Sequence, residues 1–370
     1  MSTHWLAERT RYFDASGIRK VFELGAKLKD PINLSIGQPD FDVPAPVRRA
    51  AVEAIEGRKN GYSLTQGVPA LREKLQARVR EQFGHDDREV FVTCGTSGGL
   101  MLALLVLVNP GDEVIVFDPY FVMYDSLTAV AGGKVVYVET YPDFRIDLGR
   151  VEAAITPRTK AIIFNSPANP TGVVASDEEV RGLAELAERR GVVLISDEVY
   201  SAFCYGPKFV SPAKYNRHAV VVDGFSKAYG MPGWRLGFAH GPAAIIEQMV
   251  KFQQYSFVCA PHPLQWGGVA AMDQDMRPHV ADYRRKRDLL LAGLAGYEVP
   301  RPEGAFYVFP KAPWGTAGEF VARAIEEHQL LIIPGSVFSR RDTHFRISYA
   351  ADDRTLQRGI EALRKLARRA

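Results

Sequence analysis

The chain is poor in cysteine, with only Cys94, Cys204 and Cys259 among 370 residues and no CxxC pair. So sparse and odd a set excludes a disulfide framework and is typical of a reducing compartment, so we expect a cytoplasmic protein. The three thiols are expected to be small buried side chains. His262 stands near Cys259, but no second ligand pair accompanies it, and we expect no metal site.

The chain also lacks a strong charge of either sign and any long hydrophobic run. Its formal net charge is +3, which gives no electrostatic reason to bind nucleic acid or membrane. The longest strongly apolar run, 100–108, is about half of the roughly 18–20 residues that a bilayer span needs. Residues 1–10 have no apolar core and do not form a secretory signal. The basic residues 364–369 are expected at the C-terminus of a final helix, where cations suit the helix dipole.

Short apolar runs alternate with helical segments through the middle of the chain. The strands are expected at residues 90–93, 114–117, 135–138, 161–164, 192–197 and 220–222. A helix is expected from Leu100, and Ser176 with Glu179 forms a capping box before another. Apolar strands separated by helices predict an α/β fold whose mainly parallel sheet is flanked by helices.

The last part of the chain has a different pattern, which predicts a smaller α+β domain. Helices are expected at 282–294 and 353–370, with a strand at 345–349 between them. We predict a large domain at residues 45–280 and a small discontinuous domain formed by residues 1–44 and 281–370.

The pair Ser226-Lys227 and the following Gly233-Trp234-Arg235 stand in a segment without helical or strand periodicity, after the expected strand 219–223. A lysine amine can condense with an aldehyde, and an arginine can hold a phosphate through two parallel hydrogen bonds. Pyridoxal phosphate carries both groups. An arbitrary lysine is usually a solvated surface residue, but ligands gather where parallel strands end.

Other polar and aromatic side chains follow neighbouring strands. Asp197 could pair with a pyridine nitrogen or could cap the next segment. Tyr200 could reach the phenolic oxygen of such a ring, and so could Asn169, which stands in a turn sequence. Phe121 could stack on the ring or be an ordinary core aromatic.

Two further elements could hold anions. Gly95-Thr96-Ser97-Gly98 lies between a strand and a helix, where it is either an anion cradle or a plain turn. Arg346 lies among apolar neighbours in a strand, so it needs either a substrate carboxylate or an internal acidic partner.

Together these motifs, in this order, resemble the class I/II aminotransferases, which are pyridoxal-phosphate enzymes of fold type I. The resemblance runs from residues 33–41 to residues 345–349. It implies that Lys227 binds the cofactor covalently and carries protons, with Asp197 on the pyridine nitrogen and Tyr200 and Asn169 on the ring oxygen. It further implies ring stacking by Phe121, phosphate binding by Arg235, Thr96 and Ser97, cofactor binding by Ser226, and substrate binding by Arg346, Gly37 and Asn169.

The resemblance carries two further expectations. Tyr62 matches a tyrosine that reaches the phosphate of a neighbouring subunit, which implies a homodimer with active sites at the interface. Relatives often have a phosphate-binding serine three residues before the lysine, where this chain has Gly224. One phosphate contact is therefore missing, or Ser226 replaces it.

The implied reaction moves the amino group of an L-amino acid to a 2-oxo acid, expected to be 2-oxoglutarate, by a ping-pong cycle. Residues 252–275 contain no Lys or Arg that could bind a distal carboxylate, and Ile18, Phe22 and Tyr255 could form an apolar pocket. Aromatic or large neutral substrates are therefore favoured, with aspartate still possible. The alternatives are a pyridoxal-phosphate C–S β-lyase and a non-catalytic binding protein on the same fold.

Overall fold

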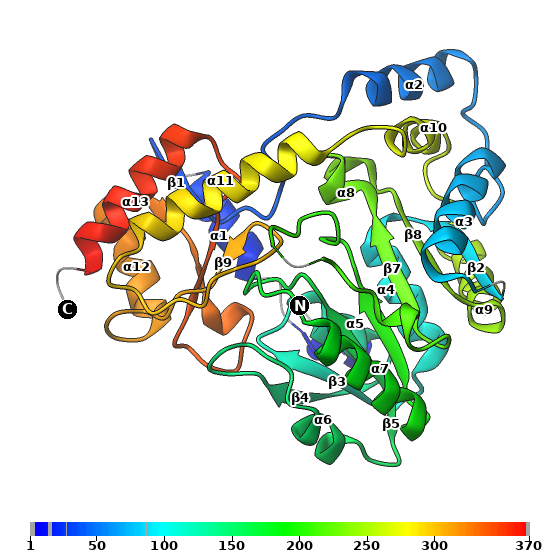
Figure 1. The fold of residues 1–370 in the computed structure, drawn as a ribbon, viewed down its shortest axis with the longest axis horizontal. Coiled ribbons are helices and arrows are strands. Elements are labelled where there is room, and N and C mark those ends of the chain that lie inside the picture. The colour runs from blue at the N-terminus through cyan, green and yellow to red at the C-terminus, as the bar shows by residue number, and fades with distance from the viewer. Residues whose placement is uncertain (1–3, 14–16, 27, 86, 207, 368–370) are drawn as a thin grey trace.

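The computed structural model describes residues 4–13, 17–26, 28–85, 87–206 and 208–367. Two regions are visible in Figure 1, with a long helix crossing between them. The helices are α1 (Gly17–Gly25), α2 (Ala45–Glu56), α3 (Pro69–Phe83), α4 (Gly95–Leu107), α5 (Met123–Val130), α6 (Leu148–Ala154), α7 (Asp177–Arg190), α8 (Phe225–Ala228), α9 (Ala243–Gln254), α10 (His262–Ala271), α11 (Arg277–Gly293), α12 (Ala317–His328) and α13 (Asp353–Ala367).

The larger region is built on a seven-stranded sheet with the order β2-β8-β7-β6-β5-β3-β4. Its strands are β2 (Arg88–Thr93), β3 (Glu113–Asp118), β4 (Lys134–Glu139), β5 (Thr159–Asn165), β6 (Val193–Asp197), β7 (Val220–Gly224) and β8 (Gly237–Pro242). Five neighbouring strands pair in parallel, in the order β7-β6-β5-β3-β4. Strand β8 runs antiparallel to both of its neighbours, β7 and β2. The six strands predicted for the middle of the chain all lie in this sheet, and the predicted α/β class is confirmed.

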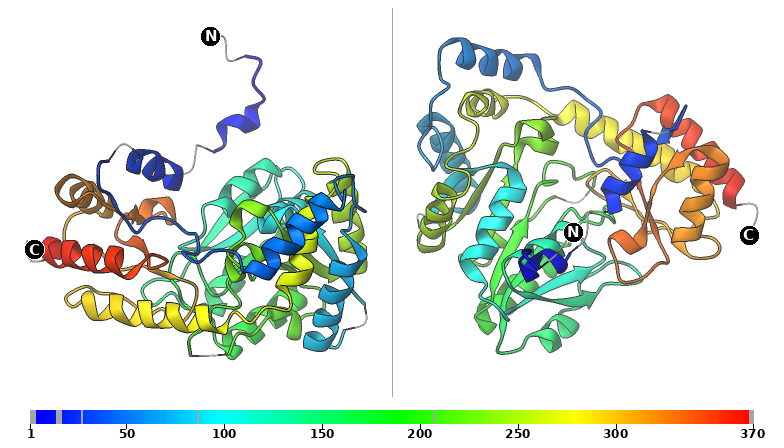
Figure 2. Two further views of the ribbon diagram at one scale, coloured as in Figure 1. Left: turned by 90° about the horizontal axis from the view of Figure 1, so that it is seen from above. Right: turned by 180° about the vertical axis from the view of Figure 1, so that it is seen from behind.

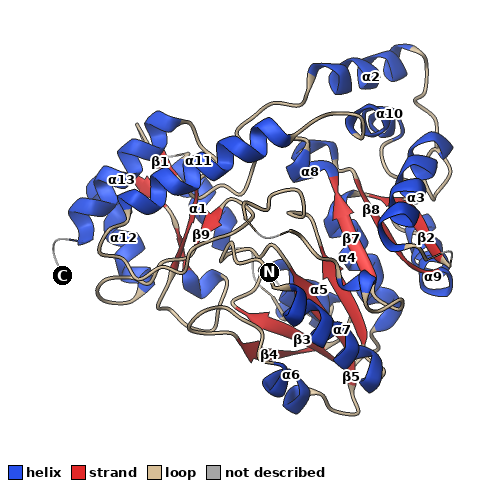
Figure 3. Ribbon diagram, viewed as in Figure 1, coloured by secondary structure: helices blue, strands red, loops and turns tan. Residues whose placement is uncertain are grey.

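Helices cover both faces of this sheet because successive residues of a buried strand point to opposite sides. In β3, Val114 and Val116 pack with residues of α4, α5 and α9, whereas Ile115 between them packs with residues of α6 and α7. Figure 3 shows the strands enclosed between these helices. The predicted capping box of Ser176 and Glu179 opens α7.

The smaller region contains two short sheets. β1 (Ile32–Asn33) pairs in parallel with β10 (Leu330–Leu331), and β12 (Phe345–Ser348) lies antiparallel between β11 (Ile333–Pro334) and β9 (Tyr307–Val308). The side of this region that carries α11 and α13 is seen in Figure 2. Because β1 comes from the N-terminal segment, residues far apart in sequence meet here. The domain boundaries stay a prediction, and α11 crosses the expected boundary at residue 280.

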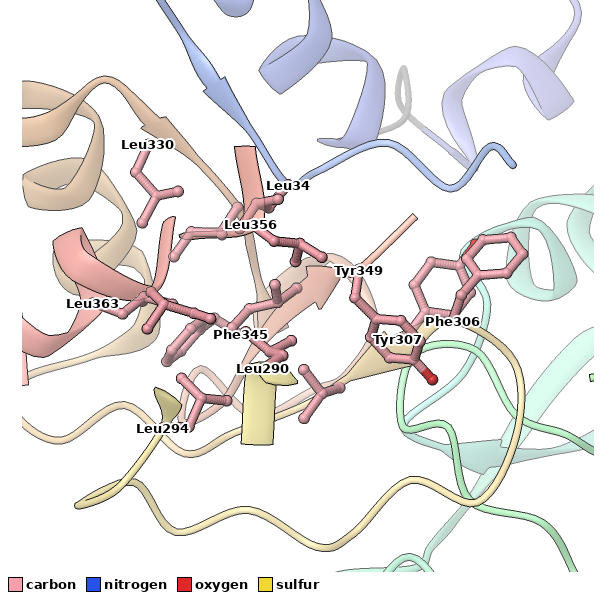
Figure 4. Packing of buried hydrophobic residues seen from close by; sticks show 14 of the residues in the cluster. Leu34, Leu290, Leu294, Phe306, Tyr307, Leu330, Phe345, Tyr349, Leu356 and Leu363 are labelled. Atoms are coloured by element: carbon pink, nitrogen blue, oxygen red, sulfur yellow. The ribbon is translucent and has the colours of Figure 1, made fainter. Parts of the chain in front are cut away.

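One hydrophobic cluster joins these short sheets to α11, α12 and α13. Figure 4 shows Leu294, Leu330 and Leu363 at one end of the cluster and Phe306, Tyr307 and Tyr349 together at the other. The aromatic end is therefore the part of this core that can reach toward the rest of the molecule.

Three local expectations were wrong. The helix predicted from Leu100 begins at Gly95, since glycines and small hydroxyl residues can occupy a first helical turn. The expected loop around Lys227 contains the single turn α8 and the 3-10 turn Pro232–Trp234. The three cysteines are free, as expected, but they are partly rather than fully buried. No described helix combines the length and apolarity needed to cross a membrane.

Candidate active site

A cavity of about 280 Å³ lies where the parallel strands end, between the large sheet and the strands β9 and β12. Eleven of the twelve predicted site residues line it. They are Gly37, Thr96, Ser97, Phe121, Asn169, Asp197, Tyr200, Ser226, Lys227, Arg235 and Arg346. The twelfth, Tyr62, does not line this cavity and is 85% exposed.

Lys227 reaches the cavity from α8, directly after the end of β7. Its Nζ atom donates a hydrogen bond to the Gly37 carbonyl oxygen at 2.5 Å. Burial, reinforced by the positive charges of Arg346 and Arg235, lowers the pKa of the Lys227 amine to about 8. An appreciable fraction of this amine is therefore unprotonated near neutral pH and can act as a nucleophile or base.

Asp197 is the last residue of β6 and is buried. The Tyr124 hydroxyl donates to its Oδ2 atom at 2.8 Å, and the Val199 amide donates to Oδ1 at 3.3 Å. Burial nevertheless raises the pKa of Asp197 to about 6. A protonated ring nitrogen placed beside this carboxylate would compensate the burial, because an opposite charge favours the ionised form. The alternative role as a cap of the next segment is also seen, since Oδ1 accepts from the Val199 amide two residues on, although no described helix begins there.

Arg346 lies in β12 and is 1% exposed. Its two terminal nitrogens donate to Asn169 Oδ1 at 3.0 Å and to the Ser35 carbonyl oxygen at 2.7 Å. Nε is buried without a hydrogen-bond partner among the described residues. No described carboxylate forms a salt bridge with this guanidinium, and each terminal nitrogen keeps a second N–H. A buried guanidinium without an acidic partner suits an incoming carboxylate.

The opposite end of the cavity is formed by the first turn of α4 and by Arg235. The Arg235 guanidinium donates to Ser97 Oγ at 3.0 Å and to the Pro232 carbonyl oxygen at 3.0 Å. Thr96 Oγ1 is buried and has no hydrogen-bond partner in the described part of the chain. A helix N-terminus, a guanidinium and an unpaired hydroxyl together make an anion site.

The packing at the same site explains why position 224 is a glycine, where relatives often have serine. A Cβ atom at position 224 would lie 2.6 Å from Thr96 Oγ1 and 3.2 Å from the Leu236 carbonyl oxygen. The Thr96 hydroxyl therefore occupies the space that a side chain at 224 would need. A side chain at position 224 and the Thr96 hydroxyl therefore exclude one another in this structure.

Comparison with known proteins bears on the chemistry of this cavity. Residues 29–363 match the family model for "Aminotransferase class I and II". The chain belongs to this family. It is 37% identical to "Aspartate/prephenate aminotransferase" of Thermus thermophilus, with 95% of this chain and 94% of the relative covered. It is 33% identical to "Aromatic-amino-acid aminotransferase 2" of Thermococcus litoralis, with 98% of both chains covered.

Solved structures of aminotransferases also match this fold. The aspartate aminotransferase from Thermus thermophilus with maleate superposes with a TM-score of 0.93 at 35% identity, covering 98% of this chain and 99% of that one. This aminotransferase is therefore a transferase enzyme, and the non-catalytic alternative is excluded.

Four residues of the candidate site were not predicted from the sequence. Tyr124 holds Asp197, Ser35 holds Arg346, and Asn165 accepts from the Asn169 amide at 2.9 Å. Tyr307 lines the cavity and forms a 2.7 Å hydrogen bond to the Tyr200 hydroxyl. Asn165 ends β5, so its position at a strand end was a usable signal; the others act through contacts across the fold that no local pattern reveals.

The residues of this aminotransferase site fit pyridoxal phosphate at both of its polar ends. The unpaired Thr96 hydroxyl beside Arg235 suits the phosphate, and the buried Asp197 carboxylate suits the pyridine nitrogen. The Lys227 amine and the Phe121 ring line the same cavity. In the described residues, no group of three or more His, Cys, Asp or Glu residues could hold a metal ion.

Proposed function

We propose that this enzyme is a pyridoxal-phosphate-dependent aminotransferase that moves the amino group of an aromatic or large neutral L-amino acid to a 2-oxo acid. The observation that carries the proposal is the convergence of Lys227, Asp197, Arg235 and Arg346 on one cavity. Three cations and one carboxylate lining one cavity leave an excess of positive charge, which a ligand with anionic groups would compensate.

Each residue has a role that follows from its place. Arg235, Thr96 and Ser97 hold the phosphate, with Ser226 adjoining them. Asp197 keeps a proton on the pyridine nitrogen, and Tyr200 donates to the ring oxygen. Asn169 uses Oδ1 for Arg346, which leaves its amide N–H groups for the same ring oxygen.

The substrate α-carboxylate binds Arg346 and lies beside Gly37. Pyridoxal phosphate, when bound, supplies an aldehyde and a ring that draws negative charge away from the substrate α-carbon. Lys227 Nζ would remove the proton from that carbon and deliver it to the carbon of the former aldehyde. In the second half of the cycle the same amine would carry a proton in the opposite direction, onto the α-carbon of the new amino acid. Its lowered pKa suits this exchange near neutral pH.

The preference for neutral substrates rests on the cavity lining. Among the described residues that line it, the cations are Lys227, Arg235 and Arg346, each already assigned. Ile18, Leu100 and Met123 supply apolar surface. Tyr255 does not belong to this lining and is 84% exposed, and the Phe22 side chain lies outside the described residues.

We expect neutral and aromatic amino acids to have lower KM values than aspartate. The acceptor that the family resemblance implies, 2-oxoglutarate, also has a distal carboxylate. Among the described residues that line the cavity there is no fourth cation to bind it. A panel of amino acids and 2-oxo acids checks both preferences, and a strong preference for aspartate would contradict the first.

A homodimer is part of the proposal. Tyr62, Leu64, Tyr255 and Phe257 are exposed. Residues 61–65 and 253–265 are joined by hydrogen bonds from Gln253, His262 and Gln265. Phe257 also approaches Gly98 in the first turn of α4, which places this apolar face next to the phosphate site. A second copy covering the face would bring its Tyr62 to that phosphate, and sedimentation of wild type and Tyr62→Ala tests the assembly.

The deciding experiment traps the covalent link. Purified protein is mixed with pyridoxal phosphate, reduced with borohydride and digested, and the labelled peptide is mapped. We expect the label on Lys227, no label and no turnover in Lys227→Ala, and normal behaviour in Lys251→Ala, whose lysine lies on α9 outside the cavity. A label elsewhere, or none, would refute the proposal.

The same preparation distinguishes transamination from β-elimination. Transamination requires a 2-oxo acid acceptor, whereas a C–S β-lyase releases a thiol and a 2-oxo acid without one. The cytoplasmic location stays a prediction from the cysteine content.

A further inference from the structure

Tyr307 links the side of the site that comes from the large sheet to the side that comes from the smaller region. It lies in β9, and its hydroxyl forms a 2.7 Å hydrogen bond with the hydroxyl of Tyr200, which follows β6. Both side chains are buried, at 1% and 4% exposure. The seven-stranded sheet and the sheet of β9 are separate, so this bond spans the gap between them.

The Tyr307 ring is fixed by Arg346. The guanidinium carbon lies 4.5 Å from the centre of the Tyr307 ring and 4.6 Å from that of Phe338. The strands β9 and β12 that carry Tyr307 and Arg346 pair directly. The Arg346 guanidinium therefore packs on the face of the Tyr307 ring, and this contact restricts where the Tyr307 hydroxyl can lie.

Gly37 leaves room for that hydroxyl. A Cβ atom at position 37 would lie 2.3 Å from the oxygen of Tyr307. The backbone carbonyl of the same residue accepts the hydrogen bond from Lys227. The Tyr307 hydroxyl is thus packed against the segment that positions the lysine, within reach of Tyr200.

We propose that Tyr307 is a positioning residue that donates its hydrogen bond to Tyr200 and so directs the Tyr200 proton to the ring oxygen of the cofactor. This inference rests on the proposed function. A hydroxyl that accepts a hydrogen bond becomes a better donor, so the pair acts as a two-step relay. The opposite direction would leave Tyr200 with no proton for the ring.

The relay has a spectroscopic consequence. The ring oxygen and the nitrogen joined to Lys227 compete for one proton in the bound cofactor. A strong donor at the oxygen lowers the proton affinity of that nitrogen. Removing the Tyr307 hydroxyl weakens the donor and raises the pKa at which the bound chromophore loses its proton.

The test titrates the chromophore of the cofactor-loaded enzyme against pH by absorbance. Tyr307→Phe keeps the ring under Arg346 and removes only the hydroxyl. We expect an upward shift of roughly 0.4–1 pH unit, the size that loss of one neutral hydrogen bond gives. Tyr200→Phe should shift the pKa further, and Tyr200→Phe with Tyr307→Phe should equal Tyr200→Phe alone.

Tyr349→Phe is the matched control. Tyr349 is buried in the same cluster, and its hydroxyl donates to the Ala305 carbonyl oxygen at 3.2 Å, outside the cavity. It should change thermal stability without moving the chromophore pKa. Fluorotyrosine incorporated at position 307 makes the hydroxyl a stronger donor and should shift the pKa downward, which keeps the test open if Tyr307→Phe folds poorly.

The outcomes separate this inference from the proposed function. An unchanged chromophore pKa in Tyr307→Phe, or additive shifts in the double variant, overturns the relay while the chromophore itself still forms. Failure of the wild-type protein to form any chromophore at Lys227 refutes the proposed function instead.

Discussion

The reactivity of Lys227 in the protein without cofactor is the most direct consequence of the site's electrostatics. With a pKa of about 8, roughly a quarter of the amine is unprotonated at about pH 7.5. A lysine with the ordinary pKa of 10.5 would be unprotonated in roughly one molecule in a thousand. The structure therefore predicts an amine that is on the order of 200-fold more available than a surface lysine at that pH.

The sign of the pH dependence follows from the lowered pKa. Below about pH 8 the ammonium form dominates, so reactivity should rise as pH increases from about 6 and level off above about pH 9. Arg346 lowers this pKa, whereas Asp197 raises it. Arg346→Gln should therefore move the midpoint upward, and Asp197→Asn should move it downward.

Competitive labelling with acetic anhydride measures this without the cofactor. The acetylation rate of the Lys227 peptide is compared with that of Lys251, on α9, across the pH range. A wild-type midpoint near the ordinary lysine value of 10.5, or shifts in the same direction for the two substitutions, would refute this electrostatic account of Lys227.

Three further predictions test the surroundings of the site. Burial raises the pKa of Glu198 from 4.5 to about 8, so the folded protein loses stability as pH rises between these values. Glu198→Gln should remove this penalty, which is on the order of 3 kcal/mol of unfolding free energy at about pH 7 and vanishes near pH 4. The difference in Tm between variant and wild type should therefore grow as pH rises from about 4 to 7. Gly224→Ser should lower the free energy of unfolding by about 1–3 kcal/mol and weaken cofactor binding. Adding Thr96→Ala should restore part of the stability, measured by denaturation, and part of the binding, measured by fluorescence titration. If the second substitution restores neither, Thr96 is not the obstacle. Tyr124→Phe removes the hydroxyl that lowers the pKa of Asp197, so cofactor affinity should fall about tenfold or more near pH 6.5 in an absorbance titration, and an unchanged affinity would count against the pairing of Asp197 with the ring.

The strands and the residues that end them could be predicted from local pattern alone. A parallel strand buried on both faces is a continuous apolar run, and the ends of such strands meet at one edge of the sheet. That is why the sequence alone assigns Asn169, Asp197 and Lys227 to one site, and the cavity lining brings them together. The starting point of α4 could not be read correctly, because glycine and small hydroxyl residues suit a turn and a helix start equally.

The sequence by itself determined the α/β class, the family and the types of chemical group available to the site. Only the tertiary structure decided which of these groups contact one another and which pKa values are shifted. Three contacts show this. Tyr124 bonds Asp197 across 73 positions, Thr96 fills the space at Gly224 across 128 positions, and Tyr307 bonds Tyr200 across 107 positions. Contacts over such distances, and the burial that shifts the pKa values of Lys227 and Asp197, arise from packing between elements, which no local pattern of residues encodes.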